Sequence, residues 1–523
     1  MNKLAQYLNQ HLHGEVFTDK DTLRHFSVDN GPLRQEPEMV VFPYETNDIR
    51  KLLRFSWQLA EKGHKLPITA RGAGLNATGG ATSSGVILSL SSHMNQIFEY
   101  DAKQRLVRLQ PGVSTVGLNN ALRLQGTAVP MMESGMQTVG GVLSDTNSAH
   151  IVDVIEQVEI VLVNGDVLQT KRLSKRELSK IKGQQGFIAD IYREVDGLID
   201  ENADLIAELD TRDASGYNAL NMVKQKDGSL DLTPLFVGSQ GTLGIISEVI
   251  IRTEYVSDAT SVVVAAFNDA ASARDALDGL GALRLAKVEY YDASLIERAK
   301  EQGKTYEFIG ETEKTPTVIV GYIDDLNSRN QARKVKKLRK VFEKAGASVT
   351  STSNFETSEF RSLEGIMALA GQSSTKATQP VVDNAYVPLE RSEDFMSGLF
   401  ELEKKLKLEL PIYGQPLEGL WTVRPLLSLE TVSGKQTLLK FIEEYRRLVE
   451  RCDGHLAGAY AEGRAQTVTV ASKRDEDDKV EALFTKLKQI FDPYNILNSG
   501  AKQPSEAREI AKLVRSDSSP RIP

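Results

Sequence analysis

The residues best suited to chemistry in this 523-residue chain form a glycine-rich loop, TARGAGLNATGGA, from Thr69 to Ala81. Its glycines allow positive φ and let backbone N–H groups converge on an anion without side-chain obstruction. Asn76 and Thr78 add two side-chain donors. The loop therefore predicts a site for the diphosphate of a dinucleotide.

Two other interpretations of this loop stay open at this point. Gly72, Gly74 and Ala77 have the spacing of a nicotinamide-binding fingerprint after a strand, but that fingerprint needs a helix that opens at the loop. The residues that follow, TGGATSSG, favour continued loop instead. The alternative is a turn with only a structural role.

The elements around the loop are predicted from periodicity. Leu66–Ala70 (LPITA) is expected to be a strand that enters the loop, and Gly85–Leu90 another. From Ser261 the pattern changes to strand 261–267, helix 270–280, strand 287–291, strand 317–322 and helix 330–345. This α+β pattern predicts a second domain, as the chain length also does.

Composition excludes several classes of protein. The net charge of −8 and dispersed Lys and Arg residues argue against a nucleic-acid partner, and the basic stretch 333–344 is expected to be a solvated helix face. Cys452 is the only cysteine, so neither a disulfide nor a cysteine metal site forms within one chain. No signal peptide or membrane-length apolar stretch is present, so we expect a cytoplasmic protein.

Four further motifs follow the loop in order. They are LQPGV at 109–113, QTVGGVLS at 137–144, LFVGSQGTLGIISEVII at 235–251 and FDPYNILNSGAK at 491–502. With the loop, they resemble the FAD-linked oxidases of the vanillyl-alcohol oxidase and p-cresol methylhydroxylase type. The most similar branch is that of the D-lactate dehydrogenase and glycolate oxidase flavoprotein subunits.

The resemblance implies an α+β fold with a two-part FAD-binding domain of the p-cresol methylhydroxylase type and a cap domain with a ferredoxin-like sheet. The expected divisions are an N-terminal helical segment (1–35), the FAD-binding domain (36–255), the cap domain (256–483), a C-terminal return (484–503) and a disordered tail (504–523). The implied FAD-binding residues are Arg71, Gly72, Ala73, Gly74, Leu75, Asn76, Pro111, Gly112, Ser134, Thr138, Gly140, Gly141, Ser144, Gly241, Gly244, Ile245, Ile246 and Asn498.

The resemblance also concerns how the flavin is held. Covalent members of the superfamily attach it through a histidine in the first loop or a cysteine further on. The loop here has neither, and Cys452 falls in the expected cap domain. FAD bound non-covalently is therefore the expected cofactor.

The substrate-side motifs depart from those of the hydroxy-acid branch. Gly414–Thr422 (GQPLEGLWT) aligns with GHxGDGNxH, so Gln415 and Thr422 replace both histidines. Gly458–Gly463 (GAYAEG) aligns with a GEHGDG-like mark, where the acid becomes Ala459 and the histidine Tyr460. No metal site is expected, because neutral amides and hydroxyls are poor substitutes for imidazole and carboxylate.

Two more departures accompany these. The family's arginine-bearing segment has no equivalent in EGIMALA at 364–370, upstream of 380–388, where Asp383 survives as a lone acid. After Ser144 the chain reaches the next strand several residues early, which predicts a flavin ring that is more open or covered by another segment.

Two functions are consistent with these motifs. The first is an FAD-dependent oxidoreductase with altered substrate specificity and an unknown electron acceptor, in which Tyr460 acts as acid or base and Arg424 binds an anion. The second is a catalytically degenerate flavoprotein that serves as a binding or scaffold subunit of an oxidoreductase partner.

Overall fold

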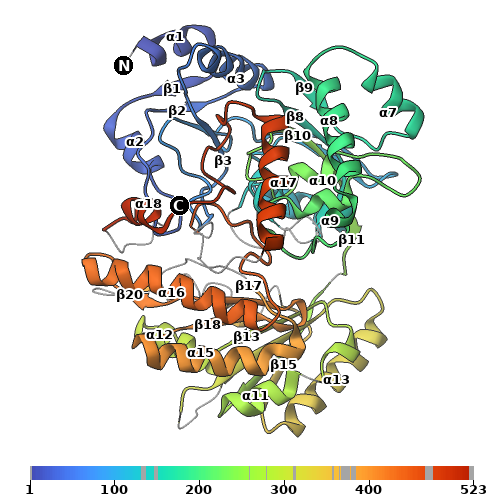
Figure 1. Cartoon of the computed structure of the whole chain (residues 1–523). Helices are drawn as coiled ribbons and strands as arrows, with labels where there is room; N and C mark the ends of the chain where they lie inside the picture. The colour runs from blue at the N-terminus through green and yellow to red at the C-terminus, as the bar shows by residue number, and fades with distance from the viewer. Residues whose placement is uncertain are drawn as a thin grey trace. The chain divides into compact units, whose positions relative to one another are not determined.

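The computed structural model describes residues 3–130, 137–146, 151–257, 259–277, 279–309, 314–355, 359–363, 366, 377–378, 385–465 and 475–516. They form two compact units (Figure 1): unit 1 comprises the described residues of 3–254 and 458–514, and unit 2 those of 255–457 with 515–516. Both units combine helices with sheets, which confirms the predicted α+β class.

Unit 1 begins with a four-stranded sheet in the order β1-β2-β4-β3. Its strands are β1 (Glu15–Phe17), β2 (Met39–Phe42), β3 (Ile68–Arg71) and β4 (Val86–Ser89), and β2, β4 and β3 run parallel. Helix α3 (Thr46–Glu61) buries Ile49, Leu52 and Leu53 in the same core as β2 and β4, as its 3.6-residue periodicity predicts. The glycine loop leaves from the end of β3.

A second, five-stranded sheet of unit 1 is antiparallel, in the order β5-β6-β10-β8-β9. Its strands are β5 (Ile97–Asp101), β6 (Leu106–Leu109), β8 (Ile155–Val161), β9 (Val167–Gln169) and β10 (Ile245–Arg252). The unit also contains β7 (Thr127–Ala128), α1 (Lys3–His11), α2 (Lys20–Phe26), α4 (Thr115–Arg123), α5 (Val139–Asp145), α7 (Lys175–Lys182), α8 (Phe187–Glu201), α9 (Ala203–Ala207), α10 (Thr233–Phe236), α17 (Asp475–Phe491) and α18 (Ala507–Leu513). Strand β11 (Glu254–Tyr255) spans the point where the chain passes from unit 1 to unit 2.

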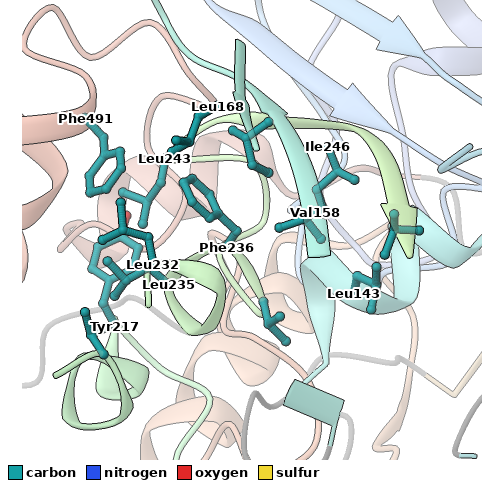
Figure 2. Close-up of a cluster of buried hydrophobic side chains, with 14 of the residues drawn as sticks. Leu143, Val158, Leu168, Tyr217, Leu232, Leu235, Phe236, Leu243, Ile246 and Phe491 are labelled. Carbon is teal, nitrogen blue, oxygen red and sulfur yellow. The ribbon is translucent and has the colours of Figure 1, made fainter. Parts of the chain in front are cut away.

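One apolar core joins the five-stranded sheet to its helices (Figure 2). Phe236 and Phe491 meet edge to face, with ring centroids 5.7 Å apart, beside Leu243. Phe491 ends α17, which adds Leu487 to the same core. Residues more than 200 positions apart in sequence therefore share one core, and this core fixes the C-terminal segment beside the first half of the unit.

Unit 2 is built on a seven-stranded antiparallel sheet in the order β15-β12-β14-β13-β18-β19-β17. The strands are β12 (Ser261–Phe267), β13 (Lys287–Tyr291), β14 (Thr317–Ile323), β15 (Ser348–Thr352), β17 (Ala385–Tyr386), β18 (Ile412–Gln415) and β19 (Leu420–Val423). Its first four strands pair in the 4-1-3-2 order of a ferredoxin-like sheet. This order agrees with the fold expected for the cap domain.

Helices and two short strands complete unit 2. They are α11 (Ala270–Leu277), α12 (Ala293–Glu301), α13 (Ser328–Lys344), α15 (Ser392–Leu406), α16 (Val432–Arg451), β16 (Ala377–Thr378) and β20 (Leu426–Leu427). Cys452 caps the C-terminus of α16 and is buried. Within the described residues of both units, no helix is long and apolar enough to cross a membrane.

Three expected segments of the chain differ from those observed. The segment from Gly458 belongs to unit 1 rather than to the cap domain, because Leu483 and Leu487 of α17 are buried in the core of unit 1. The tail expected to be disordered instead forms α18 over part of its length, and Val514 pairs with Leu33 in a β-bridge. The N-terminal segment, expected to be helical, also contributes β1.

A buried ion pair fixes α17 to the loops around it. Lys488 Nζ lies 2.5 Å from Asp492 Oδ2 and donates to the carbonyls of Thr242, at 2.7 Å, and Leu497, at 2.9 Å. Both side chains of the pair are almost fully buried, at 4% and 0% exposure. All three donor positions of the ammonium are thus used, which is what makes burial of its charge tolerable.

We expect Lys488→Met to lower the free energy of unfolding by about 3–5 kcal/mol, because Asp492 would keep a buried charge without its cation. Lys486→Met, two residues away, is the matched control: its ion pair with Glu201 is exposed, so the expected cost is about 0–1 kcal/mol. Urea denaturation of both variants checks this. Equal losses would show that the buried pair has no special role.

Candidate cofactor site

The glycine loop follows β3 without a helix. Residues 72 to 85 contain no helical turn, so the helix required by a nicotinamide-binding fingerprint is not present there. Gly74 has φ +72°, and a Cβ on Gly72 would lie 2.1 Å from Thr138 Oγ1. Both positions therefore need glycine, one for its conformation and one for the close approach of Thr138.

Two of the sequence motifs meet beside the loop. The amide of Gly140 donates to the carbonyl of Pro111, at 2.7 Å, and the amide of Val139 to that of Val113, at 2.8 Å. Thr138 is the N-cap of α5, and its hydroxyl accepts from the amide of Gly141 at 3.2 Å. The LQPGV and QTVGG turns thus form one wall next to Gly72.

A cavity of about 730 Å³ opens between the loop and this wall. It is lined by His25, Phe26, Arg71, Gly72, Ala73, Ser89, Ser91, Ser92, Asn95, Ile97, Gly112, Val113, Ser114, Gly117, Gln137 and Thr138. Five of the predicted FAD-binding residues are in this set: Arg71, Gly72, Ala73, Gly112 and Thr138. The volume is within the usual range for a cofactor site.

The lining suits a diphosphate. It includes Gly72 and Ala73 of the loop, several hydroxyls and one guanidinium, and no Asp or Glu occurs among these sixteen residues. Ser114 caps α4, and with Gly117 it places the positive end of that helix at the cavity wall. Arg71 donates to the carbonyl of Val28 at 2.8 Å and lies over the ring of Phe26, so its charge is fixed in place.

Asn76, also predicted to bind FAD, is not among the residues that line the cavity. Its Oδ1 accepts from the amides of Thr78, at 2.7 Å, and Gly80, at 3.1 Å. Its Nδ2 donates to Asp145 Oδ1 at 2.7 Å, and Gln240 Nε2 donates to the same oxygen at 2.7 Å. The side chain therefore sets the shape of the loop through its own hydrogen bonds.

Asn498 supports the loop from the C-terminal segment. Its Nδ2 donates to the carbonyls of Gly80, at 2.9 Å, and Gln240, at 2.7 Å. Its Oδ1 accepts from Thr69 Oγ1 at 3.1 Å and from Arg464 Nη2 at 2.8 Å. Arg464 also donates from Nη1 to the carbonyl of Gly79 at 2.5 Å. One amide thus joins four segments of unit 1.

The other predicted FAD-binding residues lie around this framework. Ser144 accepts the amide of Gln240 through its carbonyl at 2.7 Å, which brings the GSQGT turn against the end of α5. Ser134 and residues 147–150 lie outside the described residues. Leu75 is half-buried in the loop, Gly241 has φ +67°, and Gly244, Ile245 and Ile246 lead into β10 and its core.

Burial shifts the pKa of three groups near the loop. It raises the pKa of Asp145 and of Asp29 to about 6 each, although the amides of Asn76 and Gln240 partly offset this for Asp145. It lowers the pKa of Arg464 to about 10, and Asp29 opposes that shift. Asp29 Oδ1 accepts the amide of Gly31 at 2.9 Å, while Oδ2 has no hydrogen-bond partner among the described residues.

Several cavity residues were not predicted from the sequence. Ser89, Ser91 and Ser92 directly follow the predicted strand 85–90, and this run of hydroxyls after a strand next to the loop was an available signal. His25 and Phe26 come from α2, which precedes the loop by more than 40 residues, and no sequence pattern connects them to it. Tertiary packing alone brings them there.

The two catalytic candidates from the sequence belong to different units. Tyr460 is in unit 1, where it pairs with Thr146 in a β-bridge. Arg424 is in unit 2, where its amide donates to the carbonyl of Pro411 at 3.1 Å. Asp383 lies outside the described residues. No group of three His, Cys, Asp or Glu side chains with metal-site geometry occurs within the described part of the chain.

Unit 2 has a buried polar cluster that the sequence did not reveal. The carboxylate of Glu289 accepts hydrogen bonds from the hydroxyls of Tyr291 (2.7 Å), Tyr322 (2.6 Å) and Tyr413 (2.8 Å). Lys287 Nζ lies 2.5 Å from the same carboxylate. Although burial alone would raise it, the pKa of Glu289 is lowered, because Lys287 and the tyrosine hydroxyls stabilise the ionised form.

Gln415 extends this cluster. Its Nε2 donates to the hydroxyl of Tyr413 at 3.1 Å. Gln415 ends β18, and Thr422 is buried in the neighbouring β19. The position that aligns with a family histidine is therefore occupied by an amide that hydrogen-bonds to a tyrosine.

The glycine loop, its acid-free cavity and the separate α+β unit define a flavoprotein that binds FAD. Residues 37–171 match the family model of the FAD binding domain, and residues 256–501 match that of the C-terminal domain of FAD linked oxidases. The chain belongs to the FAD-linked oxidases, and FAD is its cofactor. It is accordingly an FAD-dependent oxidoreductase.

Similar proteins agree with this assignment. Glycolate oxidase subunit GlcD of Bacillus subtilis is 25% identical, with 92% of this chain and 93% of that protein covered. D-2-hydroxyglutarate dehydrogenase of Pseudomonas putida is 22% identical over 94% of this chain, which spans only 51% of that protein. Two solved structures confirm the predicted fold. 4-Ethylphenol oxidase from Gulosibacter chungangensis has a TM-score of 0.66 at 14% identity, with 97% of each chain covered. p-Cresol methylhydroxylase has a TM-score of 0.64 at 15% identity, with 96% of this chain and 97% of that one covered.

We expect Gly72→Ala to weaken FAD binding by roughly tenfold or more, because the new Cβ would displace the loop from Thr138. Gly197→Ala, where a Cβ meets nothing within 4 Å, is the control. Fluorescence titration of the apoproteins with FAD measures both affinities. Adding Thr138→Ala to Gly72→Ala should recover part of the loss. Unchanged affinity in Gly72→Ala would contradict the role given to this contact.

We expect the stability penalty of Asp145 to depend on pH. Its raised pKa means that the folded protein binds this proton more tightly than the unfolded chain, so stability is lost as pH rises from about 4 through about 6. Asp145→Asn removes the charge and keeps an acceptor oxygen. Its free energy of unfolding should therefore exceed that of the parent by a difference that grows by about 3 kcal/mol between pH 4 and pH 7. Urea unfolding with saturating FAD across this range tests it, with the exposed Asp204→Asn as control. A difference independent of pH would refute the assignment.

Proposed function

We propose that this flavoprotein oxidises a hydroxyl-bearing substrate of the 2-hydroxy-acid type, with a specificity that differs from that of glycolate or D-lactate dehydrogenases. The names of its relatives, a glycolate oxidase subunit and dehydrogenases of D-2-hydroxyglutarate and D-lactate, support the reaction type. The Glu289 cluster is the observation that carries the proposal. It keeps acid–base groups in unit 2 where the aligned histidine is replaced by Gln415.

Oxidation of a hydroxyl group needs a hydride acceptor and a group that takes the hydroxyl proton. FAD, when bound, supplies the hydride acceptor. The hydroxyl of Tyr413 donates a hydrogen bond to Glu289. The lone pairs of its oxygen can therefore accept a hydrogen bond, which Gln415 donates in this structure. We assign the same oxygen to the substrate hydroxyl, with Glu289 as the carboxylate that receives the transferred proton.

Other roles complete the proposal. Arg424 is retained as a candidate for binding an anionic substrate group and Tyr460 as a second candidate acid or base.

Catalysis without a bound metal stays a prediction, and unchanged activity after treatment with a chelator is its expected outcome. Non-covalent attachment predicts that acid precipitation releases the flavin into the supernatant.

Anaerobic mixing with a panel of 2-hydroxy acids, alcohols and amines tests the proposed reaction. At least one hydroxyl compound should bleach the flavin absorbance, and Tyr413→Phe should slow that bleaching by about 10²-fold or more. Tyr306→Phe is the matched control, because its buried hydroxyl has no hydrogen-bond partner among the described residues. Bleaching at the parental rate in Tyr413→Phe would remove the tyrosine from the mechanism.

The second candidate function is a flavoprotein without catalysis that serves as a binding or scaffold subunit. Loss of the aligned histidines motivates it, and the name of the Bacillus relative describes a subunit. An unreactive flavin in the whole panel, with copurification of an oxidoreductase partner, would favour this function. A cytoplasmic location remains a prediction under either function.

A further inference from the structure

Helix α13 of unit 2 has two contrasting sides. Leu338 and Phe342 are buried on the side that packs against the sheet, where α13 contacts β12, β14 and β15. Figure 1 labels this helix among the elements of unit 2. Its other side is exposed and basic. We call this side the basic ridge; it consists of Arg329, Arg333, Lys336, Lys337, Lys340 and Lys344.

The ridge is more ordered than a scatter of surface charges. At about 100° per residue, all six cations fall within an arc of about 100°, centred opposite the buried Leu338 and Phe342. At about 1.5 Å per residue, the ridge is about 22 Å long. The helix therefore presents one straight row of positive charge.

The nearby acids do not neutralise this row. Glu343 pairs with Arg339 at 3.2 Å, and Asp325 pairs with Lys334 at 3.3 Å, and neither cation belongs to the ridge. None of the six ridge cations forms an ion pair with a described residue. Like charges three and four positions apart destabilise a helix, so this arrangement opposes folding unless an anion binds there.

The shape and composition of the ridge favour a flat anionic surface. A protein partner is less suited, because protein interfaces need apolar or aromatic contact at their centre, and the ridge has none. Single-stranded nucleic acid is less suited because no exposed aromatic side chain interleaves with these cations. Leu326, two residues before α13, is a large apolar side chain that is 73% exposed, and an exposed apolar side chain next to a row of cations suits a lipid interface.

We propose that the basic ridge docks the protein reversibly on a bilayer that contains anionic phospholipids. The ammonium and guanidinium groups contact lipid phosphates, and Leu326 contacts the acyl boundary. The contact is peripheral and electrostatic, so it weakens as salt screens the charges. It does not depend on the substrate or on the proposed acid–base cluster.

Cosedimentation of the FAD-loaded full chain with vesicles tests this docking. Binding to phosphatidylcholine vesicles with one-third phosphatidylglycerol should exceed binding to pure phosphatidylcholine by roughly tenfold and disappear at about 0.5 M salt. Lys336→Glu/Lys337→Glu/Lys340→Glu should abolish the excess. Lys175→Glu/Arg176→Glu/Lys180→Glu, on the exposed side of α7 in unit 1, makes the same change in net charge and should retain most of it.

The remaining outcomes overturn the proposal. They are absence of binding to the anionic vesicles, equal losses in the two triple variants, and binding that resists salt. A fourth is retention of a labelled DNA duplex by the ridge at salt concentrations that remove the vesicles. Flavin absorbance and melting temperature of each variant, matched to the parent, separate loss of docking from loss of folding.

Discussion

The hydrogen bonds of one buried amide hold the cofactor loop in place. Asn498 donates to the carbonyls of Gly80 and Gln240, and its oxygen accepts from Thr69 and Arg464. These groups come from the loop strand, the loop, the GSQGT turn and the segment after Tyr460. A loop that must leave its outer N–H groups available for a diphosphate needs its inner polar groups satisfied elsewhere, and Asn498 does this.

The same region concentrates buried charge. Two pairs of charged residues lie in or beside the framework of the loop: Lys488 with Asp492, and Arg464 with the nearby Asp29. Asp145 accepts hydrogen bonds there from two side-chain amides. Each charge is costly to bury, and hydrogen bonds offset the cost at Lys488, Asp492 and Asp145, whereas Asp29, among the described residues, accepts one at Oδ1 only. The result is a rigid back wall, against which the cavity presents hydroxyls, backbone and a single guanidinium.

Unit 2 has a second concentration of buried polar groups, around Glu289. The amide of Gln415 bonds to Tyr413, which in turn bonds to the ionised Glu289. A tyrosine hydroxyl bonded to a carboxylate can pass a proton along its hydrogen bond, but this arrangement contains no imidazole to bind a metal.

The sequence by itself determined the cofactor, the family and the order of the main elements. Glycine spacing is local, so Gly72 and Gly74 predict a diphosphate loop without any knowledge of tertiary contacts. Strand periodicity likewise predicted β13 with the observed bounds. Tertiary structure alone decided which side chains face the cavity. Asn76 and Asn498 support the loop, and His25 and Phe26 line the cavity, because hydrogen-bond partners and packing neighbours far apart in sequence leave no periodic signal in it.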